Sequence, residues 1–318
     1  MTSFAEFRQR IKPWMLPIAM LCGILFHNSI AIIQWVVPYL IFTMLLITFC
    51  KVRPREFKVT SLSWMLLAVQ ILGSLTAYFA LRPVSVDLAQ AMFICIACPT
   101  ATAAPVVTGM LGGNVARLAT FSIISNLAAA IMTPFFFARF GVPNAGAVEF
   151  LPTFMAIAER VAPLILLPLL IALCLYFTAP RIHRAISSVQ SLSFYLWSVS
   201  LIVVVGRSVS FVLSEPSDRI GEMICIAFVS GVACALQFYI GRRIGRRCGD
   251  RISGAQGLGQ KNTILAIWMA LSFMNPISSI GPAAYVAWQN GLNSYQLYRK
   301  TRSDAKRHKQ NSLTDCLK

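Results

Sequence analysis

The sequence predicts an all-α polytopic membrane protein with about ten transmembrane helices. Of its 318 residues, 57% are hydrophobic and only 12% are charged, a balance that most soluble folds do not have. The apolar segments run for about twenty residues at a time, long enough to cross ~30 Å of hydrocarbon as helices. Basic residues fall mainly between these segments. These three observations favour a bundle of membrane-spanning helices.

Hydropathy defines the order of the elements along the chain. The ten predicted spans are residues 13–27, 29–50, 60–80, 86–110, 114–137, 152–178, 188–213, 220–240, 253–274 and 276–298. Only His27, Asn28 and Ser29 separate the first two spans, which predicts a tight helical hairpin. A basic tail, residues 299–318, follows the last span and has no apolar periodicity. We expect this tail to be frayed or without regular structure.

Charge distribution predicts the orientation. The net charge is +17. One set of alternate loops holds Arg8, Arg10, Lys12, Lys51, Arg53, Arg55, Lys58, Arg117, Arg181, Arg184, Arg242, Arg243, Arg246, Arg247, Arg251 and the basic tail; the other set holds Arg82, Arg139 and Arg219. Basic loops stay in the cytoplasm, so both termini are predicted to be cytoplasmic, in a bacterial-type inner (plasma) membrane. No aromatic-interleaved basic patch suggests nucleic acid.

An even number of spans has a consequence for symmetry. Ten spans divide into two sets of five, residues 1–137 and 152–298, and five is odd. Two consecutive five-helix units must then have opposite orientations in the membrane. This is the inverted-repeat plan of many secondary transporters, in which one helix of each half is interrupted near the midplane and faces the solute.

The fourth span contains such an interruption. In CPTATAAPVVTGMLGGN, Pro99 and Pro105 each remove an amide donor and block a helical turn, with Thr100 and Thr102 between them. One interpretation is an unwound segment whose amides and hydroxyls meet an anionic solute, aided by a helix amino terminus. The alternative is a packed, proline-kinked helix with small residues for close contact.

The ninth span contains the second interruption. In SGAQGLGQKNTILAIW, three glycines loosen the backbone, and polar groups come from Gln256, Gln260, Lys261, Asn262 and Thr263. Lys261 lies ten residues beyond Arg251, or ~15 Å along a helix, near the midplane. A lysine at this depth suggests function. In the alternative, residues 251–260 are a loop and Lys261 snorkels to the surface.

Other polar residues in the spans complete the predicted site. Ser122, Asn126 and Asn290 could line a cavity, although hydrogen bonding between helices explains them equally well. The predicted solute-binding set is Thr100, Thr102, Ala104, Pro105, Ser122, Asn126, Gln256, Gln260, Lys261, Asn262, Thr263 and Asn290. No catalytic, metal or cofactor motif is present, so we expect neither an enzyme nor a cofactor.

Two segments resemble the bile acid:sodium symporter family, in its bacterial branch. CPTATAAPVVTGMLGGNVARLATFSIISNL is similar to that family's fourth-span and fifth-span motif, and GLGQKNTILAIWMA to its ninth-span motif. The resemblance implies a core domain of spans 3–5 and 8–10, in which broken helices 4 and 9 cross, and a panel of spans 1, 2, 6 and 7. It also implies organic anions as substrates, including bile acids and other carboxylates.

The departures from the family concern sodium. The positions that supply sodium ligands in the family are Ala104, Pro105, Leu118, Ser122, Gly257 and Lys261 here. Sodium needs several oxygen ligands, preferably with a carboxylate, and most of that set is replaced. We hypothesise that the Lys261 ammonium is a built-in counter-charge, so that transport is sodium-independent and runs as uniport, exchange or proton coupling. The alternative function is a non-transporting membrane receptor or sensor on the same fold.

Overall fold

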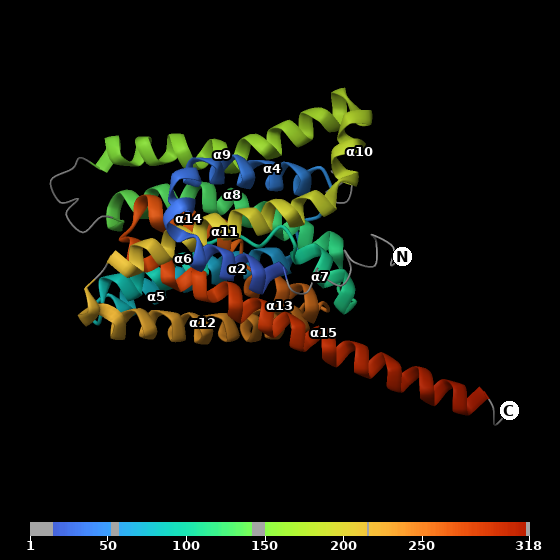
Figure 1. The fold of residues 1–318 in the computed structure, drawn as a ribbon. Helices are drawn as coiled ribbons and strands as arrows, with labels where there is room; N and C mark the ends of the chain where they lie inside the picture. The colour runs from blue at the N-terminus through green and yellow to red at the C-terminus, as the bar shows by residue number, and fades with distance from the viewer. Residues whose placement is uncertain (1–14, 52–56, 142–149, 215, 316–318) are drawn as a thin grey trace, which may run out of the picture.

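A computed structural model describes residues 15–51, 57–141, 150–214 and 216–315 (Figure 1). Every regular element in these ranges is a helix, as predicted. Six helices there are long and apolar enough to cross a membrane: Ile32–Phe49, Ser61–Leu81, Val115–Phe140, Phe150–Thr178, Tyr195–Ser214 and Ile220–Arg247. The architecture is therefore compatible with an integral membrane protein. Residues 13 and 14 of the first predicted span, and Arg8, Arg10, Lys12, Arg53 and Arg55, lie outside the described residues.

The first two predicted spans differ from a tight hairpin. Helix α2 (Met15–Leu25) is joined to α4 (Val37–Phe49) through the short helices α3 (His27–Ile30) and η2 (Ala31–Val36). Both α2 and α4 pack along α11 (Gln190–Ser214). Gly23 makes this possible in α2, since a Cβ there would lie 2.9 Å from the carbonyl oxygen of Ile202. The link is thus ten residues of helix rather than three residues of turn.

Three long helices follow in the chain, α5 (Ser61–Leu81), α8 (Val115–Phe140) and α9 (Phe150–Thr178), of which α8 is the most buried. Asn114 starts α8, because its side-chain oxygen accepts a hydrogen bond from the amide of Arg117 at 3.0 Å. Helix α8 packs against both α5 and α9, so it joins the two sides of the molecule.

The fourth and ninth predicted spans are each divided into two shorter helices. The fourth consists of α6 (Val86–Ala97) and α7 (Ala104–Leu111), and the ninth of α13 (Arg251–Gly259) and α14 (Thr263–Phe273). The predicted interruptions are confirmed, and an unbroken kinked helix in the fourth span is excluded. Gly112 ends α7 in the left-handed conformation, with φ of 85°, which favours glycine.

The remaining helices include the C-terminal tail, whose structure differs from the prediction. Helix α10 (Pro180–Ser188) joins α9 to α11, and η5 (Ser217–Arg219) precedes α12 (Ile220–Arg247). After η6 (Pro276–Ser279), α15 runs from Ile280 to Asp315 and extends beyond the bundle in Figure 1. The prediction that the tail from residue 299 lacks regular structure was wrong. The tail contains neither Gly nor Pro and continues an existing helix, so it needs no new nucleation.

Basic residues separate between the two ends of the bundle, as the loop count predicted. At one end, the Arg117 guanidinium donates to the carbonyl oxygen of Cys248 at 3.4 Å, and the amide of Asn114 donates to Asp250. This basic end joins the start of α8 to the junction of α12 and α13. At the other end, Arg219 pairs with Asp87, which joins the starts of α12 and α6.

Candidate functional site

The two helix interruptions are hydrogen-bonded to each other. The amide of Ala101 donates to the carbonyl oxygen of Gln260, and the amide of Asn262 donates to that of Pro99, both at 2.8 Å. Thr100 and Lys261 form an isolated antiparallel β-bridge between these bonds. The backbone groups that the broken helices release are therefore largely satisfied within the protein.

Thr100 belongs to this internal network. Its side chain is fully buried, and its hydroxyl donates to the carbonyl oxygen of Gly257 at 2.9 Å. Its amide donates to the Ser125 hydroxyl at 3.2 Å, and Ser125 donates to Gln70 at 2.7 Å. The Gln70 amide in turn donates to the carbonyl oxygen of Ala97, at the end of α6. In this conformation Thr100 and its amide stabilise the interruption rather than facing a solute.

Lys261 is buried, with 1% of its surface exposed, and residues 251–259 before it are helical, so it is not a lysine that follows a loop and reaches the protein surface. Its ammonium donates to the carbonyl oxygen of Ile96 at 2.7 Å, and its amide donates to the Gln289 side chain at 2.9 Å. Ile96 lies in the last turn of α6, where carbonyl groups have no helical partner and the helix dipole is negative. The ammonium thus occupies a position that favours a cation.

The other predicted residues of the ninth and tenth spans do not all lie at the interruption. Asn262 caps α14 by accepting from the amide of Leu265 at 3.3 Å, and Thr263 is buried beside it. Gln256 donates to Asn293 at 3.0 Å. Within the part of the chain that the structure describes, the side-chain oxygens of Gln256 and Gln260 are buried and accept no hydrogen bond. Asn290 instead bonds within its own helix, to the carbonyl oxygen of Val286.

Apolar packing surrounds three of the six positions at which the family resemblance would place sodium ligands, namely Ala104, Leu118 and Gly257. A buried cluster contains Leu62, Leu66, Ala104, Leu118, Phe121 and Leu258. A Cβ on Gly257 would lie 3.0 Å from both Leu66 and Phe121, so a side chain there would require these two residues to move. At these three positions the surroundings are hydrocarbon, whereas Ser122 and Lys261 keep polar groups.

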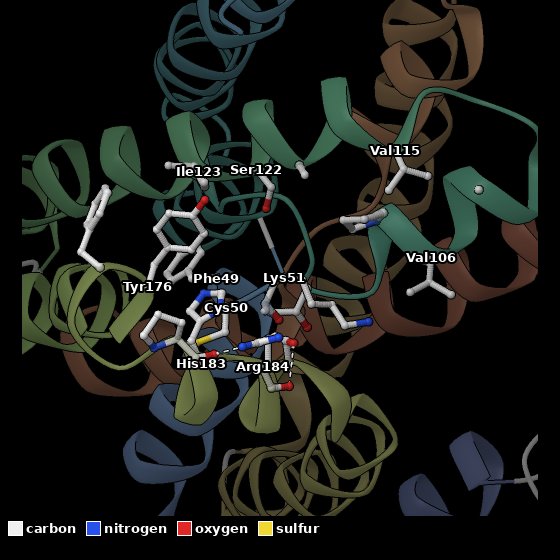
Figure 2. A pocket seen from close by; sticks show the side chains of 18 of the residues that line it. Phe49, Cys50, Lys51, Val106, Val115, Ser122, Ile123, Tyr176, His183 and Arg184 are labelled. Carbon is white, nitrogen blue, oxygen red and sulfur yellow. Dashed lines mark hydrogen bonds between the residues drawn. The ribbon is translucent and has the colours of Figure 1, made fainter. Parts of the chain in front are cut away.

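A cavity of about 910 Å³ lies at the basic end, between α7 and α8 on one side and α4, α9 and α10 on the other (Figure 2). Its lining residues are Thr48, Phe49, Cys50, Lys51, Thr102, Pro105, Val106, Gly109, Met110, Val115, Ala119, Ser122, Ile123, Tyr176, Phe177, Pro180, His183, Arg184 and Ser187. Three predicted residues, Thr102, Pro105 and Ser122, belong to this wall. Buried Asn126 is one turn beyond Ser122 and donates to its carbonyl oxygen at 2.7 Å.

The charge of the cavity is positive. Lys51, His183 and Arg184 contribute basic groups, and none of the lining residues in the described part of the chain is acidic. Figure 2 shows His183 and Arg184 across the cavity from Ser122 and Ile123. Burial lowers the pKa of His183 below its ordinary value and also lowers the pKa of Lys51. The His183 ring packs edge-on against Tyr176, with centroids 5.3 Å apart.

An apolar extension adjoins the cavity. A second hollow of about 300 Å³ shares Phe49, Ile123, Tyr176 and His183 with it. Its other walls are Phe57, Leu127, Leu169, Ala172 and Leu173. The combined space offers basic groups at one part and hydrocarbon at another, which matches an amphipathic anion.

Sequence reasoning missed the basic side of this cavity. His183 and Arg184 come from α10, a segment treated only as a cytoplasmic loop. The available signal was a short amphipathic stretch, PRIHRAISS, in which basic residues alternate with apolar ones. Comparison with known proteins adds no assignment, since no protein-family model and no curated protein matches the chain.

Proposed function

We propose that this protein is a secondary transporter that moves a small organic anion, a carboxylate or bile-acid-like compound, by alternating access. The cavity at the basic end is the observation that carries the proposal. Its volume of about 910 Å³ is at the upper end of the ~300–1,000 Å³ typical of small-molecule sites. Its basic groups and hydroxyls suit a carboxylate, and the apolar extension suits the body of the same molecule.

The arrangement of the helices supports alternating access. We propose ten spans in two inverted five-helix repeats, with both termini cytoplasmic and with helices 4 and 9 crossing near the midplane. Paired interruptions between α6 and α7 and between α13 and α14 support this plan. The cavity lies between the proposed core, which includes α7 and α8, and the proposed panel, which includes α4 and α9. Movement of one against the other would open and close it.

We further propose that transport does not use sodium. Lys261 supports this, because its ammonium binds the end of α6, where half-helix carbonyls hold coupling cations in other transporters. The apolar cluster around Ala104, Leu118 and Gly257 supports it as well. The resemblance to the bile acid:sodium symporters then concerns the scaffold and the substrate class, while the energy source differs.

The test is uptake into proteoliposomes that contain the purified full-length protein. A thermal-shift screen first selects ligands from taurocholate, pantoate and small carboxylates, because ligands of the folded state raise its stability. Uptake of the selected anion is then measured with a sodium gradient and with a potassium gradient. We expect saturable uptake of equal rate in both. Uptake that requires sodium would contradict the sodium proposal alone.

The remaining outcomes separate the other parts of the proposal. If anions stabilise the protein but none enters the vesicles, the fold serves a receptor or sensor. If no anion stabilises the protein or enters, the assignment to organic anions is wrong. Arg181→Gln supplies a matched control for cavity variants, since Arg181 lies on α10 beside the cavity-lining Arg184 but does not line the cavity.

A further inference from the structure

Four exposed arginines from three different helices meet at the basic end, away from the cavity. Arg242 and Arg246 lie on α12, Arg251 on α13 and Arg299 on α15. Arg242 is close enough to be repelled electrostatically by the other three. We call these four residues the arginine cluster. Their convergence is a property of the fold, because Arg242 and Arg299 are far apart in the sequence.

Backbone contact between α12 and α13 brings three of them together. A Cβ on Gly241 would lie 2.1 Å from the carbonyl oxygen of Gly254, and one on Gly245 would lie 3.0 Å from the Cα of Arg251. Arg242 and Arg246 directly follow these two glycines and are four residues apart, so they share one side of α12. Arg251 enters the same region from the first turn of α13.

The register of α12 against α15 adds the fourth. Gly231 accommodates the Trp288 ring, whose nitrogen donates to the carbonyl oxygen of Ala227 at 3.0 Å. The two helices run in the same direction in Figure 1. Arg242 lies eleven residues beyond Gly231 on α12, and Arg299 lies eleven residues beyond Trp288 on α15. Each separation is about three helical turns. The packing therefore brings Arg242 and Arg299 to the same level on the two neighbouring helices.

Among the residues that the structure describes, none of the four arginines takes part in an ion pair. The neighbouring acid, Asp250, is buried, and its two oxygens accept from the amides of Ser253 and Asn114. Like charges held together in a fixed arrangement repel one another, so an anion from outside the chain would stabilise the cluster.

Exposed tyrosines place the cluster at the level of lipid headgroups. The Arg299 guanidinium lies 5.8 Å from the Tyr295 ring centroid, and the Tyr295 and Tyr298 side chains are both exposed. Tyrosines of this kind mark the membrane–water interface. Beside the cluster, a hollow of about 490 Å³ is lined by Tyr295, Tyr298, Arg299, Arg302 and Ser303. Basic pockets at the cytoplasmic side bind anionic lipid headgroups.

We propose that the arginine cluster binds the phosphodiester headgroup of an anionic phospholipid at the cytoplasmic face. The guanidinium groups donate charge-assisted hydrogen bonds to the phosphate oxygens, and the tyrosines pack beside the glycerol and upper acyl chain. Binding would fasten α12, α13 and α15 together. The proposal rests on placement of the chain in a membrane and does not depend on anion transport.

The experiment compares two double variants of equal charge. Arg242→Gln with Arg246→Gln removes two members of the cluster, whereas Arg243→Gln with Arg247→Gln removes two arginines of the same helix that are not members. The full-length protein in neutral detergent is titrated with phosphatidylglycerol, phosphatidylcholine or inorganic phosphate, and its melting temperature is followed. We expect stabilisation by phosphatidylglycerol alone, with half-saturation about 30-fold weaker in the cluster variant and little changed in the control variant.

Three results would overturn the proposal. Equal weakening in both double variants would mean diffuse attraction without a built site. Equal stabilisation by inorganic phosphate would mean that the cluster binds a free anion rather than a lipid. Equal stabilisation by phosphatidylglycerol and phosphatidylcholine would mean that the cluster does not select an anionic headgroup. If the cluster variant does not fold, Arg299→Gln tests the same site from α15, and an unchanged half-saturation there would also overturn the proposal.

Discussion

The Lys261 ammonium donates a hydrogen bond of 2.7 Å to the carbonyl oxygen of Ile96, across the gap between the two broken helices. Replacing Lys261 by Met keeps most of the side-chain length and removes the donor. The carbonyl at the end of α6 then has no partner, so we expect the free energy of unfolding to fall by about 1–3 kcal/mol. Chemical denaturation in detergent measures this. The exposed Lys58→Met variant is the control, and equal stability of the two would contradict the assigned role.

Arg184 and Lys51 provide a test of the cavity. We expect Arg184→Gln or Lys51→Gln to raise the KM for the transported anion about fivefold, because each exposed charge contributes roughly 1 kcal/mol or less. The maximal rate should change little, since neither group touches the helix interruptions. Initial rates over a range of substrate concentrations separate the two parameters. Arg181→Gln should behave as the wild type; a matching rise in its KM would show that the effect is not local to the cavity.

His183 makes stability depend on pH. Burial lowers its pKa in the folded protein below the ordinary value of 6.5, so the unfolded chain takes up the proton first as pH falls. The stabilising contribution is present above pH 6.5 and is lost as pH falls from 6.5 through the lower pKa of the folded protein. We expect the melting temperature to drop less between pH 7.5 and 5.5 in His183→Asn than in the wild type. Identical pH profiles would mean that the ring is freely solvated.

Gly241 tests the contact between α12 and α13. In Gly241→Ala the new Cβ meets the carbonyl oxygen of Gly254, so the two backbones must separate, at about 1–3 kcal/mol. The matched control is Gly221→Ala in the same helix, where no atom lies within 4 Å of the added carbon. There we expect a small gain of about 0.5–1 kcal/mol from reduced backbone freedom. If both variants shifted the denaturation midpoint in the same direction relative to the wild type, the assigned close contact at Gly241 would be contradicted.

Arg219 links the ends of two helices opposite the cavity. Its guanidinium donates to Asp87 and to Glu222, and Glu222 also accepts from Ser85. Asp87 is 6% exposed, so Arg219→Gln leaves a buried carboxylate with a weaker partner. Because Arg219 itself is one-third exposed, we expect a loss of about 1–3 kcal/mol, less than for a fully buried pair. Arg82→Gln at the same end should be near neutral in the same unfolding assay.

Local sequence signals predicted the helices and their interruptions. A proline disrupts the helical turn in which it lies, so Pro99 and Pro105 predicted the break between α6 and α7 without information on the helices that pack against it. The place of Lys261 in the interior of the span, rather than in a surface loop, followed from its distance to Arg251 along the chain. The tail was mispredicted because its composition was considered alone, without the helix that precedes it and continues into it. Starting from α15, residues 299–315 needed only to continue a helix.

Contacts between distant segments could not be predicted in the same way. Thr100 was expected to face a solute, yet Gly257 and Ser125 bind it, and no sequence pattern records those partners. The same holds for His183, which reaches the cavity because α10 folds against α4 and α9. Arg299 joins Arg242 only through the register of two long helices. Residue type and periodicity describe one helix at a time, whereas these features depend on which helices pack together.

The bridge between Thr100 and Lys261 also sets an order of events during synthesis. The two bridged residues are about 160 residues apart in the sequence. Ile96 and Lys261, which are joined by a hydrogen bond, are 165 residues apart. At ~5–20 residues per second, the fourth span waits about 8–33 s before its partner is made. In the proposed placement of this span in the membrane, Pro99 and Ala101 hold unpaired backbone groups during that interval, and lipid offers them no partner. The nascent first half therefore needs water, an insertion factor or a temporary helical conformation until the second half arrives.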